Sequence, residues 1–280
     1  MAGITKEEAL RFISKEEYSS VKSKLQSNDT LYKSIGQIIA GYDDVKFEIS
    51  YRTEEIIPQA ITPDRKKVLL LFKNPHPDSV QTGLYLSEPS SKKFWNRFFE
   101  VKFNANLLPL LENDSWIQAV AKTLTSGNYD NQFLYYFKCL YPFPSRQFND
   151  LISLFSSAPN TYRQEIEKRS ISDFWAFLEK HEITYIIVFF IDGMRTLTHI
   201  PSVSSKDIIN GIKTGIDQYI CDRNTEGFWQ LYKKMKVKSS RGITFYFNMN
   251  TRTKNHGSHL PKRYFTYNLE FILQDILEDQ

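Results

Sequence analysis

The residues that could do chemistry begin directly after a short apolar run at 67–72. The loop that follows carries amide, imidazole and phenol groups beside a proline and a glycine, namely Asn74, Pro75, His76, Gln81, Gly83 and Tyr85. A neutral amide in such a loop can orient a water molecule without being a strong base. The loop is longer than the ~2–6 residues usual between a strand and a helix, and such an excess is often functional. We therefore expect the chemistry to be concentrated after residue 72.

A second set of candidate side chains follows the apolar run at 243–248. It comprises Asn250, His256 and His259, with Leu260 and Pro261 beside them. Basic residues and one tyrosine flank the histidines: Arg252, Lys254, Lys262, Arg263 and Tyr264. Such a cluster can contact phosphates, and its contribution should fall as the salt concentration rises. The alternative interpretation is a basic surface loop whose histidines have no ligand.

The elements that must position these residues are predicted by four short apolar runs. They are nearly continuous in Val, Ile, Leu, Phe and Tyr, and they lie at 67–72, 132–138, 184–191 and 243–248. Continuous patterning indicates strands that are covered on both faces. Helical segments are expected around them, at 91–102, 114–124, 146–157, 162–181, 205–221 and 262–277. This alternation predicts an α/β fold, a three-layer α/β/α sandwich with a mostly parallel four-stranded sheet.

In an open parallel sheet, ligands bind beyond the carboxyl ends of the strands, which is where both candidate sets follow their apolar runs.

Residues 1–64 have a different pattern. The spacings of Thr5 with Glu8 and of Ser14 with Glu17 are typical of capping boxes and predict short helices. The alternation at 45–51 fits an edge strand. We interpret residues 1–64 as an N-terminal helical extension and residues 65–280 as the α/β domain.

Composition limits the classes of partner. The net charge is only +4, from 36 basic and 32 acidic residues, so charge alone does not indicate a nucleic-acid partner. Two cysteines make neither a disulfide framework nor a zinc site. No run approaches the ~20 apolar residues of a membrane span, and the first residues are charged where a secretory signal would be apolar. We expect an intracellular monomer, cytoplasmic or nuclear, with no membrane partner, metal or cofactor.

Taken in order, Asn74-Pro75, Gln81-Thr82-Gly83 and Phe94-Trp95 resemble the first motif of the uracil-DNA glycosylase superfamily. The likeness is closest to its single-strand-selective and mismatch-specific branches. It implies that Asn74 takes the place of the residue that positions the attacking water. It also implies that Tyr85 lies near the aromatic floor that faces a flipped base.

The resemblance implies roles for the remaining candidates too. His256 or His259 would stabilise the departing base. The residues that would line the substrate pocket are Pro75, His76, Gln81, Gly83, Tyr85 and Asn250. The residues that would bind DNA, single- or double-stranded, are Arg252, Lys254, Lys262 and Arg263.

The chain departs from the family pattern at two places. The stretch 137–146, FKCLYPFPSR, is similar to the segment after the equivalent strand in some branches, but Tyr135, Tyr136 and Phe137 stand where many members have a base-reading Asn. The His-Pro-Ser of the second motif is absent after residue 248. Lys138 and Arg146 could equally be ordinary solvated charges at a strand end.

Three functional hypotheses follow. The first is a DNA glycosylase that flips out uracil or a related deaminated or damaged base and excises it by water attack at the glycosidic carbon. The second is a superfamily member that has lost catalysis and binds nucleic acid or protein, because the second motif and the mid-strand Asn are missing. The third is an unrelated α/β enzyme that acts on a small molecule or nucleotide, since one sheet architecture hosts many functions.

Overall fold

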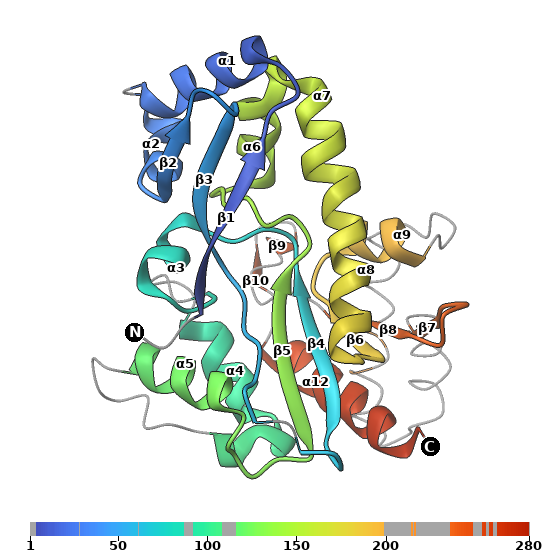
Figure 1. Ribbon diagram of the computed structural model, residues 1–280. Coiled ribbons are helices and arrows are strands. Elements are labelled where there is room, and N and C mark those ends of the chain that lie inside the picture. The colour runs from blue at the N-terminus through green and yellow to red at the C-terminus, as the bar shows by residue number, and fades with distance from the viewer. Residues whose placement is uncertain are drawn as a thin grey trace.

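The computed structural model describes residues 4–27, 29–60, 62–86, 92–107, 116–198, 214, 216, 236–248, 254–255, 258–259 and 262–279. Within these residues the fold is α/β, built around a mostly parallel five-stranded sheet with the order β5-β4-β6-β8-β7 (Figure 1). The strands are β4 (Lys66–Phe72), β5 (Phe133–Cys139), β6 (Tyr185–Val188), β8 (Thr244–Phe247) and β7 (Lys236–Lys238).

The parallel strands β4, β5, β6 and β8 are the predicted ones, and the prediction of these strands is confirmed. The predicted number of strands is wrong, because β7 adds a fifth strand antiparallel to β8 in the described part of the chain. Its sequence is KVK, so it carries no apolar run that could have indicated it. Lysines are common on edge strands, where they discourage pairing with other chains.

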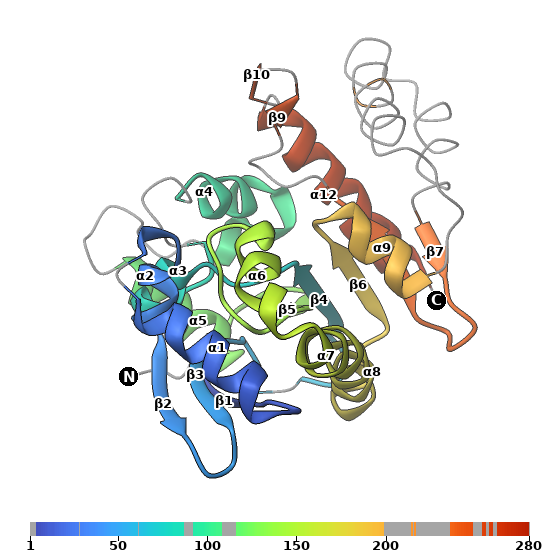
Figure 2. The same ribbon diagram turned by 90° about the horizontal axis from the view of Figure 1, so that it is seen from above.

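Helices cover both faces of the sheet, as Figure 2 shows from above. On one face the Tyr136 ring lies 6.3 Å from that of Phe177, in α8 (Arg169–His181). On the other face the Tyr135 ring lies 5.1 Å from that of Phe98, in α4 (Lys92–Glu100). The Tyr246 hydroxyl on that second face donates to Asp275, in α12 (Lys262–Glu278), at 2.7 Å. Because helices cover both faces, the side chains on either face are mostly apolar, and polar and apolar residues do not alternate along these strands.

The other described helices after residue 66 connect the strands of this sheet. They are α3 (Pro77–Thr82), η1 (Lys102–Leu107), α5 (Trp116–Ser126), α6 (Phe148–Leu154), η2 (Phe155–Ser157), α7 (Pro159–Thr161), η3 (Tyr162–Lys168) and α9 (Ile191–Thr198). Five of the six expected helical segments are confirmed by α4, α5, α6, α8 and α12. The sixth, at 205–221, lies outside the described residues apart from 214 and 216. No described helix is both long and apolar enough to span a bilayer.

The N-terminal segment differs from the helical extension that the sequence predicts. It contains α1 (Lys15–Gln26) and α2 (Thr30–Gly36), but also an antiparallel sheet of β1 (Thr5–Arg11), β3 (Glu48–Glu54) and β2 (Ile39–Asp43), in the order β1-β3-β2. The prediction of a helix at Thr5 and Glu8 is wrong, because pairing with β3 overrides the local helix signal. The Ser14 cap is confirmed, since its hydroxyl accepts the Glu17 amide at 3.2 Å.

This N-terminal sheet packs directly against the α/β part. Leu10, Ile49 and Tyr51 belong to one apolar cluster that also contains residues of the α/β part, among them Phe143 and Leu151. The expected edge strand, β3, is in fact the middle strand, because β1 and β2 both pair with it. Beyond β3 the chain continues to Ile56, which exchanges backbone hydrogen bonds of 2.9 and 3.1 Å with Phe137 of β5. The segment thereby covers the outer edge of β5.

A buried ionic group joins the two parts. The Glu55 carboxylate contacts Lys138 Nζ at 2.5 Å and Lys6 Nζ at 2.9 Å. The side chains of Glu55 and Lys138 are only 8% and 11% exposed, so the interpretation of Lys138 as a solvated charge is wrong. Burial acts to raise the pKa of Glu55, but the charges of Lys138 and Lys6 outweigh it, and the pKa lies below its usual value.

Replacing Glu55 by Gln should lower the free energy of unfolding by about 3–5 kcal/mol, because it leaves the buried Lys138 ammonium without its carboxylate. Urea unfolding of the two proteins measures this difference. Glu182→Gln is the matched control, since the Glu182 carboxylate pairs with Lys67 at 2.8 Å but is 83% exposed, and it should change stability little.

The same carboxylate gives the expected pH dependence. A lowered folded-state pKa stabilises the protein above the usual carboxyl value of 4.5, and this contribution is lost as the pH falls through the folded-state pKa. The Glu55→Gln protein should therefore show a weaker loss of stability with acid than the wild type. Equal acid sensitivity of the two proteins would contradict the assignment.

Candidate functional site

A cavity of about 180 Å³ lies at the carboxyl ends of β4, β5 and β6, where an open parallel sheet binds its ligands. Aromatic and polar side chains share its walls. The lining residues are Glu54, Phe72, Lys73, Asn74, Pro75, His76, Ser79, Tyr85, Leu86, Cys139, Ser145, Arg146, Phe189 and Phe190. The volume is below the ~300–1,000 Å³ of pockets for drug-sized ligands, so it suits one small ring system.

Asn74 is held in this cavity by the loop after β5. Its amide nitrogen contacts the Ser145 carbonyl at 2.9 Å, the Ser145 hydroxyl at 3.0 Å and the Pro75 carbonyl at 3.2 Å. A further hydrogen bond of 3.0 Å from the Ser145 amide to the Pro75 carbonyl ties the two loops together. These contacts fix the orientation of the amide, so that Asn74 Oδ1 is the atom that can accept a hydrogen bond from a water molecule.

His76 and Ser79 add polar groups on the same side. His76 precedes α3, and its Nδ1 accepts the Asp78 amide hydrogen at 3.2 Å. A neutral ring with that acceptor carries its proton on Nε2, which is then a donor. Within the described part of the chain the buried Ser79 hydroxyl has no hydrogen-bond partner, although it lines the cavity. Both residues belong to the lining of the cavity.

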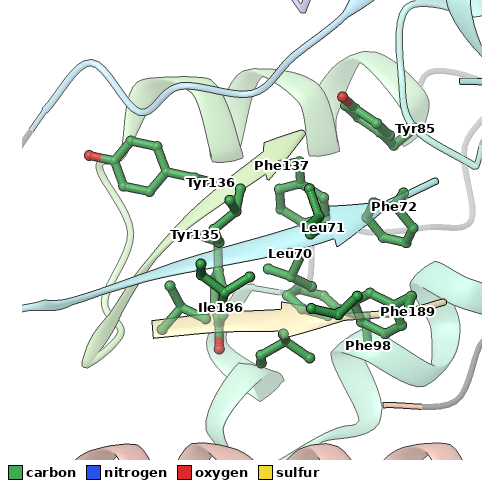
Figure 3. Close-up of a cluster of buried hydrophobic side chains, with 14 of the residues drawn as sticks. Leu70, Leu71, Phe72, Tyr85, Phe98, Tyr135, Tyr136, Phe137, Ile186 and Phe189 are labelled. Carbon is green, nitrogen blue, oxygen red and sulfur yellow. The ribbon is translucent and has the colours of Figure 1, made fainter. Parts of the chain in front are cut away.

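Aromatic rings form the apolar wall. Phe72 and Phe189, at the ends of β4 and β6, stack with ring centroids 4.8 Å apart and planes at 4° (Figure 3). Tyr85 continues the stack, with its ring 5.8 Å from that of Phe72, and its hydroxyl donates to the Glu54 carbonyl. These rings are only 2–6% exposed, so the wall is a closely packed apolar surface against which a small ligand can lie.

The thiol in the cavity is not an activated nucleophile. Burial raises the pKa of Cys139 well above its usual value, and the charge of Glu54 raises it further. Burial likewise raises the pKa of Tyr85. Both groups stay neutral near pH 7, and a neutral thiol is a weak nucleophile. Neither group is therefore a candidate nucleophile at this site.

Two basic residues lie at the cavity. Arg146 is exposed, and Lys73 Nζ lies 3.3 Å from the Asp192 carboxylate and 4.0 Å from the centre of the Phe148 ring. Lys73 is thus held in place by an acidic and an aromatic neighbour. Because Asp192 balances the charge of Lys73, the exposed Arg146 is the basic side chain of the cavity lining that can contact an anionic ligand.

The structure separates Gln81 and Gly83 from the cavity, which corrects their predicted role in substrate binding. They line a different cavity of about 630 Å³, next to Thr5 and Arg52. Gln81 lies in the last turn of α3, and its side chain donates to that of Gln37, the residue that follows α2, at 2.9 Å. Gly83, with φ of 80°, ends α3 in a left-handed conformation that favours glycine.

The second set of candidates falls mostly outside the described residues. Asn250, Arg252 and His256 lie outside them. His259 belongs to β10 (Ser258–His259), which pairs with β9 (Lys254–Asn255), and Lys262 and Arg263 begin α12. Only the backbone of Lys254, His259, Lys262 and Arg263 is described. The predicted roles of these side chains stay predictions.

The cavity also contains residues that were not predicted. Cys139 ends β5 and Ser145 lies in the segment after it, and Phe189 and Phe190 belong to the apolar run at 184–191. Neither a strand end of the parallel sheet nor an apolar run indicated Glu54, because this residue belongs to the separate N-terminal sheet. Tyr135 and Tyr136 stand at the expected place of a base-reading amide, but neither side chain lines the cavity. The Tyr135 hydroxyl donates to Asn104 at 2.6 Å, and the Tyr136 ring lies 5.5 Å from that of His181.

The amino-acid sequence matches no family model and no curated protein. The family resemblance of the loop after residue 72 therefore stays a prediction, and the function has to be inferred from the geometry of the cavity.

Replacing Tyr85 by Phe should destabilise the protein by about 1–3 kcal/mol, because it leaves the buried Glu54 carbonyl without its donor. Tyr136→Phe is the matched control. Its buried hydroxyl has no hydrogen-bond partner among the described residues, so its removal should be neutral or stabilising. Thermal and urea unfolding of both variants measure the difference, and equal losses would contradict the role of the Tyr85 hydroxyl.

Proposed function

We propose that the protein is a DNA glycosylase of the uracil-DNA glycosylase type, with the three-layer α/β/α sandwich of that superfamily. It flips uracil or a related deaminated or damaged base into the cavity and cleaves the glycosidic bond with water. The observation that carries this proposal is the position of Asn74, in a cavity sized for one small ring system and walled by Phe72 and Phe189.

The chemistry follows from the orientation of Asn74. Its Oδ1 accepts a hydrogen bond from a water molecule, whose oxygen then attacks the glycosidic carbon as the bond to the base nitrogen breaks. The water proton leaves to solvent, and the base departs with the electron pair of the broken bond. A neutral amide suffices, because the sugar is already electrophilic in an oxocarbenium-like transition state. His76 Nε2 can donate to the departing base, beside the predicted His256 or His259.

Stacking on the cavity wall offsets part of the cost of flipping. Removing a base from the stack costs a few kcal/mol, and stacking on an aromatic side chain returns ~1–3 kcal/mol per base. In the proposed complex the base would contact the aromatic wall of Phe72, Phe189 and Tyr85 at the strand ends. A deaminated base that pairs poorly is the easiest to extrude, which adds to selectivity.

The described residues on either side of the second candidate set support its proximity to Asn74. The Asn248 amide donates to the Val188 carbonyl at 3.0 Å, at the end of β6. The Phe265 ring, in the first turns of α12, lies 6.1 Å from that of Phe189, which lines the cavity. The intervening segment thus leaves from and returns to the edge that carries the cavity. This supports the proposal that a histidine from it reaches the base.

A second candidate function is nucleic-acid binding without catalysis. The Tyr135 hydroxyl, near the expected base-reading position, donates a hydrogen bond to Asn104 on the α4 side of the sheet. A binding module would retain Arg146 and the aromatic wall without needing the water-positioning amide. Release of a free base distinguishes the two functions.

The wild-type protein should release uracil, hypoxanthine or xanthine from an oligonucleotide, and Asn74→Ala should slow release by about 100-fold or more, because the water loses its acceptor. Quantification of the free base and of alkali-cleaved abasic sites measures this. Asn128→Ala is the control, since Asn128 is exposed and outside the cavity. Salt-sensitive binding without release would favour the second function, and unaltered release by Asn74→Ala would refute the assigned role.

Arg146 should contribute one phosphate contact to DNA binding. Arg146→Gln should reduce the slope of log K against log salt by about 0.7–0.9, because one counterion fewer is released. Fluorescence anisotropy over a salt series gives the slope. Arg163→Gln is the control, since Arg163 is exposed in η3 and does not line the cavity, and its slope should equal that of the wild type. An unchanged slope for Arg146→Gln would remove this residue from the interface.

A further inference from the structure

We infer that Glu54 reads the edge of the base in the cavity: its carboxylate accepts a hydrogen bond from the ring N–H that deamination creates. The inference rests on the proposed function and adds the residue that determines specificity. It concerns the N-terminal sheet, whose last residue in β3 is Glu54.

Glu54 is held at the cavity by its own backbone. It is 3% exposed and lines the cavity together with Asn74 and Tyr85. The Tyr85 hydroxyl donates to the Glu54 carbonyl, and the next residue, Glu55, is fixed by Lys138 and Lys6. These contacts hold the backbone at Glu54 in place at the cavity wall, so its side chain starts from a fixed position, as base recognition requires.

The charge of Glu54 acts on its neighbours. Burial raises the pKa values of Cys139 and Tyr85, and the negative charge of Glu54 raises them further. These groups therefore stay protonated and do not compete with Glu54 as anions. A buried carboxylate is stabilised by hydrogen-bond donors, and an N–H of a bound base would be such a donor.

A carboxylate distinguishes a deaminated base from its parent. When ionised it only accepts hydrogen bonds. Cytosine and adenine have a ring nitrogen with a lone pair at the edge where uracil and hypoxanthine have a ring N–H. The parent base would thus place a lone pair against the carboxylate, whereas the deaminated base would place a donor there. The two bases therefore differ in sign at this contact, since a lone pair and an ionised carboxylate repel each other whereas an N–H and a carboxylate attract.

No other side chain of the sheet serves this purpose in the described cavity. The Tyr135 and Tyr136 side chains of β5 point to opposite faces of the sheet, toward α4 and α8, and neither lines the cavity. Asn74 is oriented by Ser145 and Pro75, which leaves it the role of holding water. Glu54 is the carboxylate among the lining residues.

The experiment measures binding, so that it does not depend on turnover. Oligonucleotides carry a 2′-fluoroarabino nucleotide, which resists glycosidic cleavage, with uracil, hypoxanthine, cytosine or adenine as its base, and a tetrahydrofuran abasic analogue serves as the reference. The wild-type protein should bind uracil and hypoxanthine at least about tenfold more tightly than cytosine and adenine. Glu54→Gln should reduce this preference by about tenfold or more, since an amide can turn either its oxygen or its nitrogen toward the base.

Two further variants complete the test. Glu54→Asp keeps the charge but withdraws it by one methylene, so it should weaken binding of uracil while keeping the order of the bases. Glu48→Gln, at the other end of β3 and outside the cavity, should bind as the wild type does. Unfolding curves confirm that each variant is folded.

The outcomes separate this inference from the proposed function. A preference of the wild type for the amino bases, no preference at all, or an unchanged preference in Glu54→Gln would overturn the role of Glu54, even if base release occurs. A preference that depends on Glu54 but is accompanied by no base release would remove the glycosylase and leave base reading in place.

Discussion

The rest of the structure depends on the burial of β4 along residues 68–72. Its neighbours β5 and β6 take up its backbone hydrogen bonds, and its residues 68–71 are wholly inaccessible to solvent. A strand enclosed on both edges and both faces cannot carry unpaired polar groups without a large cost. Polar side chains therefore begin where β4 ends, at Lys73 and Asn74. The position of the candidate site follows from this burial.

The strands beside β4 end at the same level, so the segments that follow the three strands meet at the cavity. The amides of Leu140 and Phe189, which follow β5 and β6, still donate to carbonyls at the end of β4, at 2.8 and 3.0 Å. The loop after β5 can thus hold the Asn74 amide through Ser145. On the other side Ile56 pairs with β5 and brings Glu54 to the cavity. Three distant segments fix the polar groups before any ligand arrives, which is the basis of preorganisation.

The amino-acid sequence by itself determined the α/β class, the parallel strands and the place of Asn74. These features leave local signals, because a strand covered on both faces needs a continuous apolar run, and a proline directly after Asn74 ends the pairing. Ser14 was likewise recognisable as a helix cap, since capping involves residues only three positions apart.

Tertiary structure alone decided which residues meet. Thr5–Arg11 has the local pattern of a helix, yet it is a strand because β3 pairs with it. Lys138 looks like a surface charge, yet it is buried against Glu55. Gln81 follows Asn74 closely but faces another cavity, whereas Glu54, from a separate sheet, faces the same one. Sheet pairing and cavity lining join residues that are far apart in the chain, and neither periodicity nor local propensity carries information about such contacts.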